Sequence, residues 1–196
     1  MRAVSRREIY FITHPDVVVD PHTPVPDWSL SERGLARMRA GLSQPWIARL
    51  TAVYSSAERK AREGGEILAE RVGCTLQVRP ALGEVDRSAT GYLPHAEHEA
   101  TANAMFAEPD VSARGWETAR NAQRRIVGAL TALLAEDASP GAIAIVSHGA
   151  VGALLLCHVL QRPIARVHDQ PGSGGGHYFA FHAGGDILHG WKRFDS

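Results

Sequence analysis

Short apolar segments that alternate with helical ones constrain the fold of this chain more than any other feature of its sequence. Residues 9–12 (Ile-Tyr-Phe-Ile) and 142–146 (Ala-Ile-Ala-Ile-Val) lack polar alternation, a pattern typical of strands buried on both faces. Two weaker strands are expected at residues 51–54 and 75–78. Because parallel strands need long crossover connections and helices supply them, the alternation predicts an α/β fold. We expect a three-layer α/β/α sandwich with a mainly parallel sheet.

Helical sequence connects these strands. Four helices are expected, at residues 30–42, 55–71, 115–135 and 149–160. A serine followed three residues later by a glutamate is a capping-box pattern, and it marks the start of the first helix at Ser29 and of the second at Ser55. Residues 178–181 and 187–191 predict a closing hairpin. No repeat or boundary interrupts this order, so a single domain over residues 1–196 is expected.

A long polar segment, residues 82–112, is rich in histidine and glutamate. Segments of this length in compact domains are often functional, so we expect a loop with one short helix that forms a flap over a site. Within it, His95 and His98 could be two metal ligands on one helical turn. Because no third ligand follows at a suitable spacing, the sequence predicts no metal and no cofactor.

Net charge excludes several classes of partner. The chain has 21 Lys+Arg and 21 Asp+Glu, so no strong positive field attracts nucleic acid or an anionic membrane. We therefore expect neither partner, and any anionic ligand must be held by a local site. The apolar stretch that follows the basic N-terminus (residues 1–8) is too short for a signal-peptide core. Cys74 and Cys157 lie far apart in apolar contexts, which indicates free thiols in a cytoplasmic protein.

Two of the ten histidines occupy equivalent positions. His14 follows the first strand, and His148 follows the strand at residues 142–146. Because the carboxyl ends of parallel strands form the ligand crevice, both imidazoles should reach the same edge of the sheet. The second helix begins at that edge, and helix N-termini favour bound anions. Arg59 and Lys60 lie in its first turns, where they either face an anionic ligand or belong to a solvated basic face.

Several short motifs fall in a fixed order along the chain: Ile12-Thr13-His14-Pro15, Leu30-Ser31-Glu32-Arg33-Gly34, Ser55-Ser56 followed by Lys60-Ala61, Leu82-Gly83-Glu84, and Val146-Ser147-His148-Gly149. In this order and spacing they resemble the histidine phosphatase superfamily, whose fold is phosphoglycerate-mutase-like. The resemblance covers most of the chain. It implies a phosphomonoesterase that acts without a cofactor on a small-molecule or protein phosphate ester.

The resemblance also implies roles for individual side chains. His14 would be the nucleophile that takes the phosphoryl group as a phosphohistidine. His148 would be a charged hydrogen-bond donor beside the phosphate, and Glu84 the acid that protonates the leaving-group oxygen. A further set of residues would bind the phosphate: Thr13, Arg59, Lys60, Arg87 and Gly149. Such a site is chemically reasonable, because a neutral imidazole can attack phosphorus near pH 7 and electrostatic stabilisation dominates phosphoryl transfer.

The chain is a divergent member of this pattern, because residues 13–15 are Thr-His-Pro in place of Arg-His-Gly. An arginine binds phosphate through a charged bidentate fork, whereas a threonine offers one neutral hydrogen bond. The second arginine of the pattern is Lys60 here, and Arg59 lies about 100° round the helix from it. Arg87 is another candidate for the replacement cation. The alternative function is that of a catalytically weak or inactive relative that binds a phosphorylated or anionic ligand or a partner protein.

Overall fold

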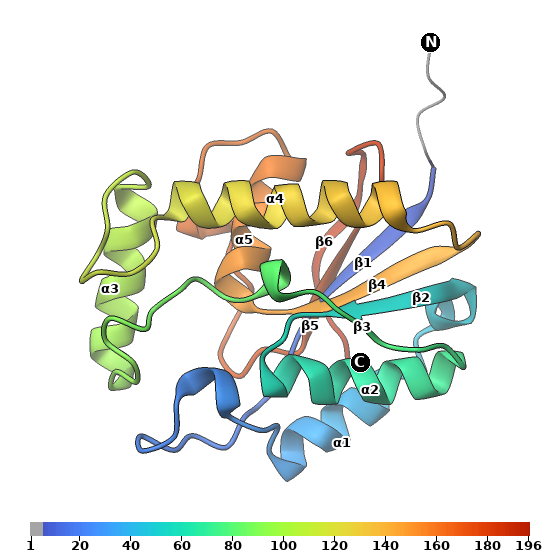
Figure 1. The fold of residues 1–196 in the computed structure, drawn as a ribbon, viewed down its shortest axis with the longest axis horizontal. Coiled ribbons are helices and arrows are strands. Elements are labelled where there is room, and N and C mark those ends of the chain that lie inside the picture. Colours follow the sequence, from blue (N-terminus) through green and yellow to red (C-terminus); the bar gives the residue numbers. More distant parts are fainter. Residues whose placement is uncertain (1–5) are drawn as a thin grey trace.

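The centre of the fold is a sheet of six strands in the order β3-β2-β4-β1-β5-β6 (Figure 1). The structure, a computed structural model, describes residues 6–196, so residues 1–5 of the basic N-terminal segment lie outside the described residues. The strands are β1 (Glu8–Thr13), β2 (Leu50–Ser55), β3 (Gln77–Val78), β4 (Ala142–Ser147), β5 (His177–His182) and β6 (Ile187–Arg193). β1 to β4 pair in parallel, and β5 runs antiparallel to both of its neighbours, β1 and β6. The predicted mainly parallel sheet and its closing hairpin are confirmed.

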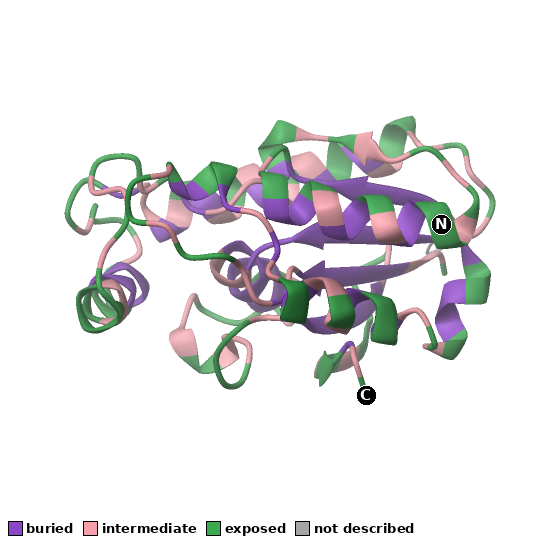
Figure 2. Ribbon diagram, turned by 90° about the horizontal axis from the view of Figure 1, so that it is seen from below, coloured by how far each residue is buried: buried purple, intermediate pink, exposed green. Residues whose placement is uncertain are grey.

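Helices cover both faces of the sheet. They are α1 (Glu32–Gly41), α2 (Arg59–Val72), α3 (His95–Ala107), α4 (Ala119–Glu136) and α5 (Gly149–Val159). α4 and α5 lie over one face, and α1 and α2 lie over the other (Figure 1). Successive side chains of β1 belong to the two different cores, because Phe11 packs on the α4 and α5 side and Ile12 on the α1 and α2 side. The central strands are therefore buried along most of their length, which confirms the three-layer α/β/α sandwich (Figure 2).

Two helices begin later than the sequence predicts. α1 follows Ser31, whose hydroxyl accepts a hydrogen bond from an N–H of the first turn at 3.1 Å, so Ser29 is not the cap. α2 follows Glu58, whereas Ser55 is the last residue of β2 and its hydroxyl donates to the Ser56 carbonyl at 3.0 Å. Both capping-box predictions are wrong, because the backbone of each serine pairs with another segment. Ser55 is still part of β2, and the carbonyl of Ser29 accepts from the Val18 N–H at 2.9 Å.

The long polar segment contains a helix of 13 residues, α3, which is longer than the short helix expected there. α3 stands to one side of both helical layers (left in Figure 1). Its Ala102, Met105 and Phe106 are buried and belong to the same core as α4 and α5. The helix is therefore packed firmly enough to form one wall of a site beside the sheet.

Three further observations concern the chemistry of the chain. Cys74 and Cys157 are free thiols, the second of them buried. Over residues 6–196, no group of three or more His, Cys, Asp or Glu side chains is arranged to hold a metal ion. In the same range, no helix combines the length and apolar character needed to cross a membrane.

Candidate active site

A cavity of about 840 Å³ opens at the carboxyl ends of β1 and β4. His14 and Gly149 lie at these strand ends, and Glu84 and Arg87 reach the cavity from the segment that precedes α3. α3 supplies one wall, and the glycine-rich residues 172–175 supply the opposite rim. The parallel order of β1 and β4 is what brings residues more than a hundred positions apart to one opening, as expected for the crevice of an α/β sheet.

His14 is held so that one ring nitrogen is free. Its Nδ1 lies 2.9 Å from the carbonyl oxygen of Pro15. A carbonyl can only accept, so Nδ1 carries the proton and Nε2 keeps its lone pair. Burial, supported by the nearby charge of Lys60, lowers the pKa of His14 to about 4. The imidazole is therefore neutral and nucleophilic at physiological pH.

His148 lies beside His14, with the two ring centroids 5.1 Å apart and the rings inclined by 70°. It is fully buried, and its Nε2 lies 2.7 Å from the Ser56 hydroxyl and 3.3 Å from Oε1 of Glu58. Its Nδ1 is also buried and has no hydrogen-bond partner within residues 6–196. Burial lowers the pKa of His148 well below its ordinary value, although Glu58 opposes this effect. A nearby anion would favour the charged form and supply the missing partner.

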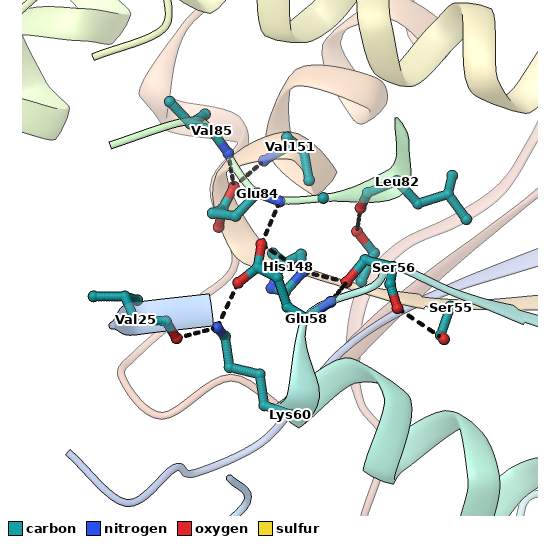
Figure 3. A network of polar contacts seen from close by, with 12 residues as sticks. Val25, Ser55, Ser56, Glu58, Lys60, Leu82, Glu84, Val85, His148 and Val151 are labelled. Carbon is teal, nitrogen blue, oxygen red and sulfur yellow. Dashed lines mark hydrogen bonds and ion pairs between the residues drawn. The ribbon is translucent and has the colours of Figure 1, made fainter. Parts of the chain in front are cut away.

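Glu58 connects His148, Lys60 and the backbone of Glu84 (Figure 3). Its Oε1 accepts from the Glu84 N–H at 2.9 Å, and its Oε2 accepts from the buried Lys60 ammonium at 2.5 Å. Burial works against the charge of the Glu58 carboxylate, but His148 and Lys60 outweigh it and lower the pKa of Glu58 to about 2. Glu58 is therefore a permanent negative charge that faces Nε2 of His148.

Glu84 places its carboxylate at the N-terminus of α5. Its Oε1 accepts from the Val151 N–H at 3.0 Å, and its Oε2 accepts from the Ala150 N–H at 3.1 Å. These are backbone donors that a helix leaves unpaired in its first turn. Burial raises the pKa of Glu84, and the backbone hydrogen bonds act in the opposite direction. The group therefore lines the cavity in a setting where it can hold a proton at a higher pH than an ordinary glutamate.

Two histidines at the ends of neighbouring parallel strands, with a carboxyl group beside them, match a known family. The sequence model of the histidine phosphatase superfamily (branch 1) matches residues 16–178, which is most of the chain. The chain belongs to this superfamily. The matched segment begins just after His14, so the divergent residues 13–15 lie outside it.

Solved structures of histidine phosphatases share the fold, which confirms the predicted resemblance. A mycobacterial glucosyl-3-phosphoglycerate phosphatase in complex with inorganic phosphate has a TM-score of 0.73 and 22% identity, over 95% of this chain and 94% of that chain. A phosphoserine phosphatase from Entamoeba histolytica, in complex with 3-phosphoglyceric acid, has a TM-score of 0.74 and 14% identity, over 97% of this chain and 100% of that chain. A comparison with curated proteins found no match.

Two of the three cations that the sequence predicted at the phosphate site, Arg59 and Lys60, do not line the cavity. Lys60 does not line the cavity, because its ammonium is buried between Glu58 and the Val25 carbonyl, 2.8 Å away. Arg59 points elsewhere, since its exposed guanidinium pairs with Glu63 at 2.8 Å on the outer side of α2. Neither side chain is brought to His14 in the way that the expected phosphate contacts would require.

Arg87 does line the cavity, as the sequence suggested for a replacement cation. Its Nη1 lies 2.6 Å from Nε2 of His98, a neutral acceptor, and it forms no ion pair with a carboxylate within residues 6–196. Arg166, which no sequence motif indicated, also lines the cavity, but it pairs with Glu99 at 2.6 Å and with Asp169 at 3.7 Å. Arg87 is therefore the cation of the cavity wall whose charge is left for a ligand.

Thr13, the residue that replaces the family arginine, is fully buried and does not reach the cavity. Its hydroxyl donates to Oε1 of Gln170 at 2.6 Å and accepts from the His177 N–H at 3.0 Å. Gln170 does line the cavity, next to Gly149. Gln170 belongs to no motif of the sequence, and its contact with Thr13, 157 positions away, leaves no local signal. Glu58 does belong to a motif, but that motif predicted a helix cap rather than a contact with His148.

Proposed function

We propose that this superfamily member is a phosphomonoesterase that hydrolyses phosphate esters through a phosphohistidine on His14. The observation that carries the proposal is the state of His14 in the cavity. Its Nδ1 proton is held by the Pro15 carbonyl, which leaves the Nε2 lone pair free, and His148 stands beside it at 5.1 Å between ring centroids. A low pKa of about 4 keeps the nucleophile neutral at the pH of turnover.

The reaction would proceed in two balanced steps. Nε2 of His14 attacks phosphorus and forms an N–P bond as the ester P–O bond breaks, and the departing alkoxide takes the proton of Glu84. Water then attacks the phosphohistidine, gives a proton to the Glu84 carboxylate, and releases inorganic phosphate with the imidazole restored. Dividing hydrolysis in this way replaces one difficult displacement by two easier ones.

His148 and Glu58 would stabilise the phosphoryl group together. A phosphate dianion beside the unpartnered Nδ1 of His148 raises the affinity of that imidazole for a proton. The resulting cation would donate from Nδ1 to the phosphate and from Nε2 toward Glu58, whose Oε1 is already 3.3 Å away. Arg87 supports the same charge from the cavity wall. The expected substrate is a small-molecule or protein phosphate ester, a class consistent with the phosphatases that share the fold.

A weak or inactive relative that binds an anionic ligand is the second candidate. The cavity lining carries four carboxylates, Asp16, Glu84, Glu99 and Asp169, against two arginines, Arg87 and Arg166. This balance favours the second candidate because it weakens the electrostatic stabilisation on which phosphoryl transfer depends. Asp16 pairs with Arg37, and Glu99 and Asp169 both pair with Arg166, which reduces but does not remove the imbalance. In this case the protein would bind phosphate without turning over its esters.

Replacing His14 and measuring turnover and phosphoenzyme formation tests the proposal. Wild type should hydrolyse an aryl phosphate and yield an acid-labile phosphoenzyme on rapid quenching, and His14→Ala should lose both. His158→Ala, which removes an exposed histidine of α5 outside the cavity, is the matched control and should behave like wild type. Turnover that persists in His14→Ala would contradict the proposal. Phosphate binding without turnover in wild type would establish the second candidate.

A further inference from the structure

The carboxamide of Gln170 spans the gap between the two strand ends that carry the histidines. Its Oε1 accepts from the hydroxyl of Thr13, the residue before His14, at 2.6 Å. Its Nε2 lies against Gly149, the residue after His148, so closely that a Cβ at position 149 would be 2.6 Å from it. The side chain therefore lines the cavity beside the two strand ends that carry His14 and His148.

Thr13 fixes which way this amide faces. Its buried hydroxyl accepts from the His177 N–H at 3.0 Å. The hydroxyl oxygen lies 2.6 Å from Oε1 of Gln170 and 3.3 Å from the His177 carbonyl, so the shorter contact to Gln170 is the stronger of its two donor contacts. Because Oε1 is engaged by Thr13, the two N–H donors of the amide are carried by the other terminal atom, Nε2, on the Gly149 side. The backbone of Gln170 is also restrained, because its N–H donates to Oδ1 of Asp169 at 2.8 Å.

The two N–H donors of the Gln170 amide have no acceptor among the residues that the structure describes, 6–196. The amide is only half-buried and lines the cavity that holds His14. A lining side chain that is held at its oxygen by a buried hydroxyl and has unpaired donors on its nitrogen is arranged to meet an acceptor that enters the cavity.

We propose that Gln170 is a phosphate-binding residue, held in place by Thr13, and that its Nε2 donates to the phosphoryl group between His14 and His148. The inference rests on the proposed function and extends it to a residue that no motif of the chain marks. It also accounts for the threonine at position 13: this side chain is too short and too fully hydrogen-bonded to reach the phosphate, and its role is to position a glutamine that can. The neutral amide of Gln170 would thus serve in place of the arginine that the superfamily pattern has at position 13.

Gly149 fits the same arrangement. The Cβ of any other residue would lie 2.6 Å from Nε2, closer than side-chain atoms approach one another, so the amide would have to shift from its position. The glycine thus gives the Gln170 side chain the room to lie between the strand ends.

The experiment measures binding of inorganic phosphate by calorimetry, so that it does not depend on turnover. Gln170→Glu keeps the shape and replaces both donors by a charge, and Gln170→Met removes the donors without adding a charge. Both should weaken phosphate binding about tenfold to a hundredfold, the effect of losing a hydrogen bond to a charged group. Gln161→Glu, an exposed glutamine just past α5, is the control for the added charge and should bind phosphate like wild type.

Thr13 variants test whether this residue positions the Gln170 amide or only contributes to the stability of the fold. Thr13→Val removes the orienting hydroxyl at constant shape and should weaken phosphate binding as Gln170→Met does, whereas Thr13→Ser keeps a hydroxyl and should restore most of the affinity. Unfolding midpoints of the same proteins show whether a loss of affinity comes from unfolding. If Gln170→Met or Thr13→Val binds phosphate as tightly as wild type, the role of Gln170 is refuted.

The two proposals fail in different ways. If turnover requires His14 but phosphate affinity is unchanged in the Gln170 variants, the proposed function holds and the role of Gln170 is refuted. If the protein has no turnover but its phosphate affinity depends on Gln170 and Thr13, the role of Gln170 holds and the proposed function is refuted. Wild type that does not bind phosphate at all would overturn the inference directly.

Discussion

Lys60 and Glu58 form a buried ion pair, with 2.5 Å between Nζ and Oε2, and this pair faces the protein rather than the cavity. The lysine takes the place of an arginine in the superfamily pattern, yet its charge is neutralised by the carboxylate that contacts His148. Its consequence for the site is indirect. Lys60 keeps Glu58 ionised, and Glu58 in turn faces Nε2 of His148.

Replacing Lys60 should destabilise the protein more than removing a surface cation. Lys60→Met leaves Glu58 as an uncompensated charge and should lower the free energy of unfolding by about 3–5 kcal/mol. Arg59→Met removes the neighbouring exposed cation and its pair with Glu63, and should change it by less than about 1 kcal/mol. Urea unfolding of both variants measures the difference, and equal effects would show that the Lys60 pair is not buried as described.

Stability should fall with acid because of Glu58. Its pKa is lowered in the folded state from an ordinary value of 4.5 to about 2, so the unfolded chain takes up its proton first. The stabilisation is complete above pH 4.5 and is lost as the pH falls toward 2; a shift of this size corresponds to about 3 kcal/mol. Asp137, with a pKa also lowered to about 2, contributes in the same window. The measured quantity is therefore the difference between wild type and Glu58→Gln, which should shrink between pH 6 and pH 2; a constant difference would contradict the prediction.

Glu84 should matter most for esters with poor leaving groups. If its carboxyl protonates the departing oxygen, Glu84→Gln should lower kcat about 10²–10⁴-fold for an alkyl phosphate, the usual contribution of general acid catalysis. Nitrophenyl phosphate should be much less affected, because nitrophenolate departs without a proton. Steady-state kinetics with both substrates test this prediction. Equal losses on the two esters would assign Glu84 to the structure of the α5 N-terminus instead.

His14 should remain neutral in mildly acidic solution. Because burial lowers its pKa to about 4, its imidazole resonances should titrate near pH 4, with the assignment made by comparison with His14→Ala. Formation of the phosphoenzyme in rapid-quench experiments should fall with the same midpoint, once ionisation of the substrate phosphate has been allowed for. A midpoint near 6.5 in the NMR titration would mean that His14 is solvated rather than enclosed by its surroundings.

The elements of the fold follow closely from local sequence. The continuous apolar runs that became β1 and β4 have no polar alternation, because both of their faces are covered by helices. The placement of His14 and His148 follows from the same pattern, since each comes directly after such a strand. The helix starts were harder to predict: Ser29 and Ser55 carry capping-box spacing, but their backbones are engaged in pairing with other segments.

The strands, their order of alternation with helices and the two histidines at one edge were all decided by local patterns, because apolar periodicity and strand ends are properties of neighbouring residues. The direction in which each polar side chain of the site faces was decided only by tertiary contacts. The Lys60 ammonium lies away from the cavity because it donates to the carbonyl of Val25, 35 positions away, beside its ion pair with Glu58. Thr13 meets Gln170 from 157 positions away, and no local pattern can encode which donor that contact leaves free.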